Sequence, residues 1–171
     1  CSYQHRLDEL FWPGVEISFK DLTLNGASRD YALATAAAFA DLPLWPGGVV
    51  RPRAGYRACL YKPDGNYDNR GPLAGIAVRQ RVVKRLGVNL SYEFQDRAYE
   101  GKAWRLVPDV AGAVKVIRSV EARGDETHTL SAGFEVQRGV LLSGGYTLVY
   151  NASDSVGESI IRHRVMVLAS A

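Results

Sequence analysis

The chain has 171 residues, which suits one domain, and its hydrophobic (47%) and charged (23%) fractions exclude a disordered or low-complexity protein. A net charge of +3 without a long Lys/Arg run argues against nucleic-acid binding. The two cysteines, Cys1 and Cys59, fit neither a metal-ligand spacing nor a disulfide framework, so we expect no metal and no cofactor.

The N-terminal residues 1–14 have no clear hydrophobic period, and they are interpreted as a short plug, a linker or part of another strand. A chain that begins at Cys1 matches a mature bacterial lipoprotein acylated on that residue, or a fragment that starts there. The remaining residues 15–171 are predicted to form one β domain.

Eight segments alternate apolar with polar or small residues, a pattern that predicts β-strands because successive side chains point to opposite faces. They are 15–24, 30–42, 49–62, 73–83, 86–99, 127–137, 140–151 and 159–170. Residues 30–42 are rich in alanine and could also form a helix. Residues 114–120 predict a further strand or an extension into a loop.

The clearest alternation lies at residues 86–94. One face carries Leu86, Val88, Leu90, Tyr92 and Phe94, and the other carries Gly87, Asn89, Ser91 and Glu93. No apolar run approaches the ~20 residues of a transmembrane helix, but a barrel strand needs only ~9–11 residues with a polar lumen-facing side. The pattern is therefore compatible with a strand that crosses a membrane.

The predicted connections alternate between short and long. Short turns lie at 43–48, 84–85 and 138–139, and longer polar links lie at 63–72, 100–126 and 152–158. Outer-membrane barrels have this asymmetry, with short periplasmic turns and longer extracellular loops. We therefore predict an all-β fold: an antiparallel up-and-down β-barrel of about eight strands, or the last eight strands of a larger barrel.

The polar faces of the predicted strands carry the candidate functional residues. This predicted lumen charge network consists of Arg51, Arg53, Arg57, Arg79, Arg81, Glu93, Glu135, Arg162 and Arg164. Inside eight strands these side chains would form a packed ionic network without a pore, whereas a larger barrel would make them a channel lining with anion preference. Tyrosines near strand ends fit the aromatic belts of membrane barrels.

Two alternatives remain open beside a non-enzymatic membrane barrel. One is a soluble lipocalin-like barrel that binds lipid. The other is an outer-membrane enzyme that modifies lipid A, since such enzymes use His and Ser at a barrel rim, and His128 and Ser131 lie near a loop with Asp125 and Glu126. His128 and Ser131 are three residues apart and so face opposite sides of a strand, which opposes a catalytic pair; no catalytic residue is predicted.

Several motifs in the second half of the chain support a family resemblance. Residues 123–128 (Arg-Gly-Asp-Glu-Thr-His) precede a strand and a tight Arg-Gly turn, and residues 146–150 (Tyr-Thr-Leu-Val-Tyr) precede Asn-Ala-Ser at 151–153. A closing strand contains Arg162-His163-Arg164, and residues 57–69 and 90–99 show a similar sequence pattern. This pattern resembles the C-terminal hairpins of bacterial outer-membrane barrels linked to tetratricopeptide repeats, including the surface lipoprotein assembly modifier type.

The resemblance implies a bacterial outer-membrane location and a structural, porin-like transport or export role. It implies contact with membrane lipids and lipopolysaccharide, no nucleic acid, and a periplasmic or secreted protein as a further partner. Such barrels end in Phe or another aromatic residue, whereas this chain ends Ala169-Ser170-Ala171.

Overall fold

The structure is a computed structural model that describes residues 2–4, 11–22, 31–61, 68–108, 114–138, 140–157 and 159–170. The described residues form nine strands: β1 (Ser2–Gln4), β2 (Trp12–Leu22), β3 (Tyr31–Trp45), β4 (Gly48–Tyr61), β5 (Asn69–Val83), β6 (Leu86–Pro108), β7 (Val114–Arg138), β8 (Val140–Ser153) and β9 (Ile160–Ser170). No helix long and apolar enough to cross a membrane occurs in this part of the chain.

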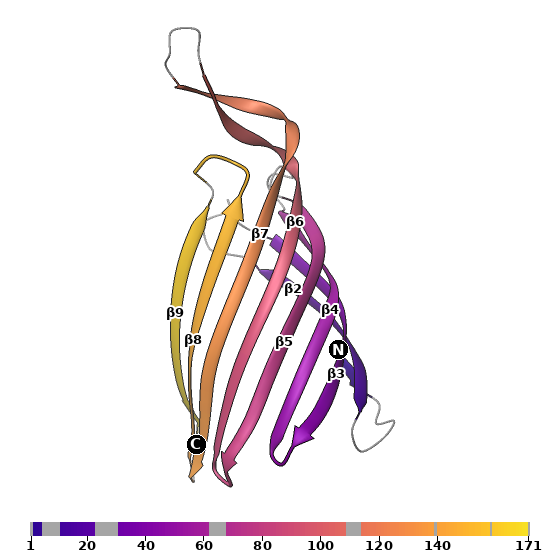
Figure 1. Cartoon of the computed structure of the whole chain (residues 1–171), viewed down its shortest axis with the longest axis vertical. Coiled ribbons are helices and arrows are strands. Elements are labelled where there is room, and N and C mark those ends of the chain that lie inside the picture. The colour runs from indigo at the N-terminus through magenta and orange to yellow at the C-terminus, as the bar shows by residue number, and fades with distance from the viewer. Residues whose placement is uncertain are drawn as a thin grey trace.

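All nine strands belong to one antiparallel sheet in which each strand pairs with its neighbours in sequence (Figure 1). The predicted all-β, up-and-down fold is therefore confirmed. The alanine-rich segment forms strand β3 rather than a helix, because β2 and β4 pair with it on both sides and this pairing outweighs its helix propensity. The strand β1 pairs with β2, so part of the N-terminal segment belongs to the sheet.

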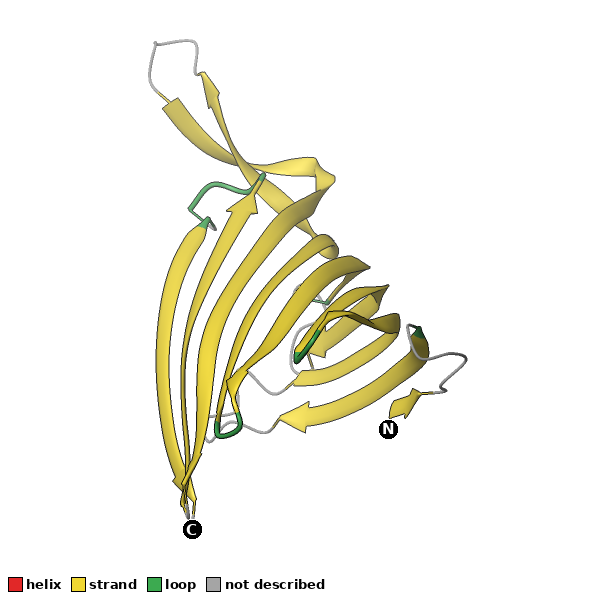
Figure 2. Ribbon diagram, turned by 60° about the horizontal axis from the view of Figure 1, so that its bottom comes forward, coloured by secondary structure: helices red, strands yellow, loops and turns green. Residues whose placement is uncertain are grey.

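The sheet is strongly curved but open in the described residues (Figure 2). There, β1 pairs only with β2 and β9 pairs only with β8, so closure into a barrel stays a prediction. The short turns and the C-terminal end of β9 lie at the lower end of Figure 1, and the long connections lie at the upper end.

The expected loop at residues 100–126 is largely strand, so that prediction was wrong. There β6 and β7 continue past the rest of the sheet as a two-stranded ribbon, with Trp104 opposite Arg118 and Pro108 opposite Val114 (Figure 1). Register shifts between Ala98 and Lys102, and between Lys102 and Trp104, mark where the ribbon departs from the sheet. The alternation noted at 114–120 is the start of β7. Likewise, β5 begins at Asn69, inside the expected link 63–72.

The register between strands aligns apolar residues with apolar residues and polar residues with polar residues, so the whole sheet has two distinct faces. Ile76, Tyr92, Leu130 and Leu148 form one row across β5–β8, and Ser91, Ser131 and Thr147 form a row on the opposite side. The alternation predicted at residues 86–94 is thus confirmed and extends across the sheet. We call these sides the apolar face and the polar face.

The apolar face is more exposed to solvent than the polar face. On the apolar face Ile17 is 63% exposed, Leu90 51% and Val165 75%. On the polar face Thr35 is 5% exposed and Gln95 4%. The sheet therefore curls around its polar side chains and leaves its large apolar side chains outside, the reverse of a soluble protein.

Candidate functional site: the polar face

The centre of the polar face is an ion-pair cluster whose side chains come from β3, β4 and β6. Arg57 of β4 donates from Nη1 to Glu93 Oε1 of β6 at 2.9 Å and to Gln95 Oε1 at 3.3 Å, and from Nε to Thr35 Oγ1 of β3 at 3.2 Å. Arg53 Nη2 lies 3.4 Å from Glu93 Oε2. One carboxylate thus holds two guanidinium groups, and all three side chains are only 23–26% exposed.

A glycine of the intervening strand allows this cluster to form. In the register Arg53 lies opposite Gly75 of β5, and Gly75 lies opposite Glu93. A Cβ atom at Gly75 would lie 3.3 Å from Arg53 Cγ and 2.9 Å from the carbonyl oxygen of Tyr92. A larger residue would block the path that Arg53 takes across β5, so the glycine places the charges in reach of each other.

A second ion pair lies toward the short-turn end. Arg51 donates from Nε and Nη2 to the two carboxylate oxygens of Asp41, each at 2.5 Å, and its guanidinium stacks 4.4 Å from the ring centroid of Phe39. This two-bond arrangement fixes both side chains more firmly than a single contact does. Asp41 was not among the predicted site residues.

A third cluster lies at the long-connection end, beyond the apolar rows. Asp125 is 2% exposed and accepts hydrogen bonds from Arg123 Nε at 3.0 Å and Nη2 at 2.6 Å, and from Asn151 Nδ2 at 3.1 Å. Burial alone would raise the pKa of this carboxyl, but the hydrogen bonds from Arg123, Ser153 and Asn151 and the charge of Arg123 lower it overall. The carboxylate therefore stays ionised at neutral pH.

Tyr99 covers this third cluster. The Arg123 guanidinium lies 4.2 Å from the centroid of the Tyr99 ring. Burial and the nearby Asp125 charge raise the pKa of the Tyr99 hydroxyl above its ordinary value, so it stays protonated. Two residues of the motif at 123–128, Arg123 and Asp125, thus connect β7 with Tyr99 of β6 and Asn151 of β8, which the sequence pattern did not predict.

The other five residues of the predicted charge network also lie on the polar face. Arg81 and Glu135 stand in one register row with Gly87 between them, and Arg164 lies opposite Thr147. In the described part of the chain, no ion pair within 4.0 Å is found for Arg79, Arg81, Glu135, Arg162 or Arg164. The structure therefore brings Arg51, Arg53, Arg57 and Glu93 into ion pairs, and among the residues it describes the other five have none.

The residues considered for catalysis lie on opposite faces. His128 is on the apolar face, where its Nδ1 is 2.8 Å from Tyr92 Oη and its ring lies between Phe94 and Tyr150, at centroid distances of 5.2 and 5.9 Å. Ser131 is on the polar face, 3.1 Å from Thr147 Oγ1. The described residues hold no group of three or more His, Cys, Asp or Glu side chains that could bind a metal ion.

Histidine–tyrosine contact occurs twice on the apolar face. His163 Nδ1 of β9 lies 2.6 Å from Tyr146 Oη of β8, which repeats the Tyr92–His128 arrangement. Each hydrogen bond satisfies a polar atom on an otherwise apolar surface.

Comparison of the chain with protein-family models, curated proteins and solved structures finds no match in any of the three. The structure itself is an all-β sheet with one apolar and one polar face. The resemblance to tetratricopeptide-linked barrels rests on the sequence motifs alone.

Proposed function

We propose that this chain forms the wall of a bacterial outer-membrane β-barrel with a non-enzymatic role in structure, transport or export. The observation that supports this proposal is the inverted arrangement of the sheet. Large apolar side chains are exposed from β2 through β9, while the arginine–carboxylate pairs lie on the opposite, less exposed face. A membrane barrel requires this arrangement, with lipid outside and a polar interior.

The exposed apolar face is too extensive for a monomeric soluble surface. Its side chains include Phe19 (70% exposed), Ile76 (46%), Phe134 (41%), Tyr150 (45%) and Val167 (67%), which come from five different strands. Soluble monomers rarely expose contiguous apolar patches larger than a few hundred Å². Acyl chains would cover this face, and the Tyr–His pairs suit the polar–apolar boundary of a bilayer.

The two alternatives agree less well with the side-chain positions. A lipocalin-like barrel places large apolar residues inside, and here they face outward. A rim enzyme needs His and Ser within hydrogen-bond reach, and His128 and Ser131 lie on opposite faces. The partners that the proposal implies are membrane lipids, lipopolysaccharide and an exported or periplasmic protein.

Charge placed on each face tests the proposal. Leu90→Arg puts a guanidinium group on the apolar face of the sheet. Asn89→Arg puts the same group at the neighbouring position, on the polar face. We expect Leu90→Arg to destabilise the membrane-inserted state by about 2–4 kcal/mol, and Asn89→Arg to have little effect. The measurement is the fraction of refolded full-length chain that floats with phospholipid vesicles in a density gradient.

Two results would contradict the proposal. One is equal flotation of the two variants, which would mean that neither face contacts lipid preferentially. The other is a stable, monomeric full-length chain that remains in solution without detergent and does not bind vesicles.

A further inference from the structure

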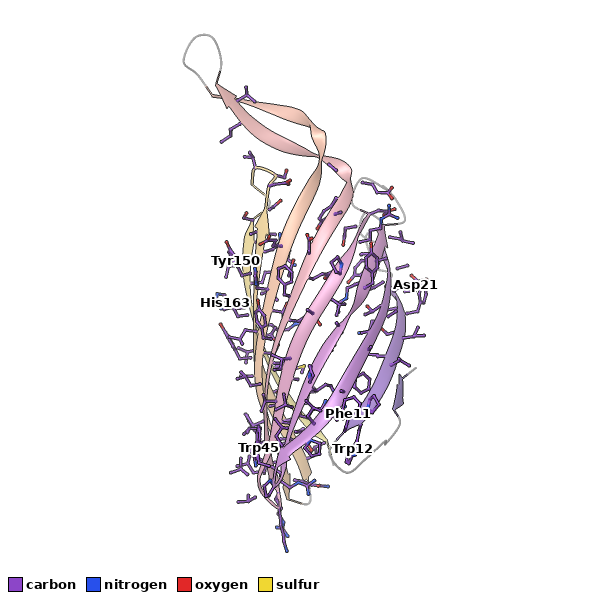
Figure 3. All side chains as sticks on the ribbon, turned by 45° about the vertical axis from the view of Figure 1, so that its right-hand side comes forward. Phe11, Trp12, Asp21, Trp45, Tyr150 and His163 are labelled. Carbon is purple, nitrogen blue, oxygen red and sulfur yellow. The ribbon has the colours of Figure 1, made fainter. Side chains whose placement is uncertain are left out.

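A basic hollow lies at the short-turn end of the sheet, between the β3–β4 and β5–β6 hairpins. It has a volume of about 700 Å³ and is open to solvent. Four cationic residues line it, Arg79, Arg81, Lys84 and Arg85, against one carboxylate, Glu135. Trp45 forms part of the wall and lies at the lower end of the sheet (Figure 3).

Hydrogen bonds between hairpins hold the frame of this hollow. The Arg81 backbone N–H donates to the carbonyl of Gly47 at 2.7 Å, and the Gln137 N–H donates to the carbonyl of Arg85 at 2.9 Å. Gln80 accepts a hydrogen bond from Trp45 Nε1 and donates to the Arg81 carbonyl at 2.8 Å. These backbone and side-chain hydrogen bonds connect the neighbouring turns, and the cationic residues lie on the strands and turns that they connect.

The β3–β4 turn depends on glycine at this point. Gly47 has a φ of +74°, a conformation that residues with a Cβ rarely adopt. A Cβ there would also lie 3.1 Å from the Arg81 carbonyl oxygen. The glycine therefore lets the turn approach β5 closely and brings Arg81 to the edge of the hollow.

The charges of the hollow are unbalanced. In the described part of the chain, no carboxylate lies within 4.0 Å of Arg79, Arg81, Lys84 or Arg85. All four side chains are exposed, whereas Arg51 is paired with Asp41, and Arg53 and Arg57 are paired with Glu93. Like charges gathered around one space repel each other, and a bound anion would remove this repulsion.

We propose that this hollow binds a phosphate-type anion. Guanidinium groups donate two parallel hydrogen bonds to phosphate oxygens, and an ammonium group adds a mobile point charge. Three arginines and a lysine around one space supply both kinds of donor. The phosphate could belong to a free pyrophosphate-like molecule or to the headgroup of an anionic lipid, and the recognition chemistry is the same for both. This proposal goes beyond the barrel function and does not require the apolar face to contact lipid.

Titration with sodium pyrophosphate tests the site in the full-length chain held in an uncharged detergent. Calorimetry at constant ionic strength, with sodium chloride as the control salt, should show one saturable site. Arg79→Gln/Arg81→Gln should weaken binding about tenfold or more, since it removes two charge-assisted donors. Arg162→Gln/Arg164→Gln is the matched control: it removes the same charge from the polar face of β9, away from the hollow, and should leave binding unchanged.

A second variant keeps the test decisive if the double substitution unfolds the chain. Glu135→Gln removes only the competing carboxylate and should tighten pyrophosphate binding severalfold, since it takes a negative charge away from the anion. Circular dichroism on each variant verifies that the sheet is retained.

Two lipid arms identify the source of the phosphate. Micelles doped with phosphatidylglycerol or with phosphatidylcholine are titrated with the same protein. Preference for phosphatidylglycerol with competition by pyrophosphate assigns a lipid headgroup, and binding of pyrophosphate without that preference assigns a free phosphate compound. The proposal is overturned if pyrophosphate shows no saturable binding, or if the two double variants weaken binding equally, which would indicate net charge alone.

Discussion

At the scale of single residues, the ion pairs of the polar face depend on small residues that leave room for the long charged side chains beside them. Gly75 lets Arg53 reach the Glu93 carboxylate two strands away. The sequence could predict that Arg51, Arg53, Arg57 and Glu93 share a face, because alternation alone assigns faces. It could not predict their partners, since these depend on the register between strands, and so Asp41 was missed.

The Glu93 carboxylate should matter more to stability than an unpaired one on the same face. Glu93→Gln leaves Arg53 and Arg57 without their shared counter-charge and should lower the free energy of unfolding by about 1–3 kcal/mol. Glu135→Gln is the control: Glu135 has no ion pair within the described residues, so a change within about 0.5 kcal/mol is expected. Urea titration of vesicle-refolded protein measures both, and equal losses would contradict the assigned ion pairs.

At the scale of elements, strand positions followed from the alternation and from the turns. The segment at 86–94 was identified correctly because its period of two continues through nine residues. The β6–β7 ribbon was missed because residues 100–113 have no clean alternation, and the bulges near Lys102 shift the faces. In that region the paired partner strand, rather than the local pattern, determines the structure.

The ribbon should be dispensable for the sheet. Replacing residues 102–120 with an Asn-Gly turn keeps the pairing of Leu86 with Val136 through Ala98 with Gly124. Vesicle insertion should therefore be retained, and the urea midpoint should stay equal or rise slightly because the connection is shorter. Deleting Ser91 alone is the control, since it turns every following side chain to the other face and should abolish insertion. Loss of insertion on removing the ribbon would show that the ribbon nucleates the hairpin.

At the scale of the whole molecule, the described residues form a sheet with an outward apolar face and two edges that pair with no further described strand. In a bilayer the backbone N–H and C=O groups of an edge strand need partners, so an embedded sheet has to be closed. Strand β1 covers only Gly14–Glu16 of β2, so Ile17–Leu22 also lie at that edge of the sheet. Strands β2 and β9 run in opposite directions because seven antiparallel steps separate them, which would permit an antiparallel closing pair along this part of β2. The curvature in Figure 2 agrees with such closure, which remains part of the proposed function.

The proposal that the apolar face contacts lipid can be tested directly by spin labels placed one at a time at residues 86–94. Cys1→Ser and Cys59→Ala remove the native thiols, and the labelled chains are refolded into vesicles. We predict that collisions with dissolved oxygen, which concentrates in lipid, peak at positions 88, 90 and 92, and that collisions with a water-soluble nickel chelate peak at 89, 91 and 93. Absence of a two-residue period, or a period with the opposite phase, would contradict the proposal that the apolar face of this sheet faces a membrane.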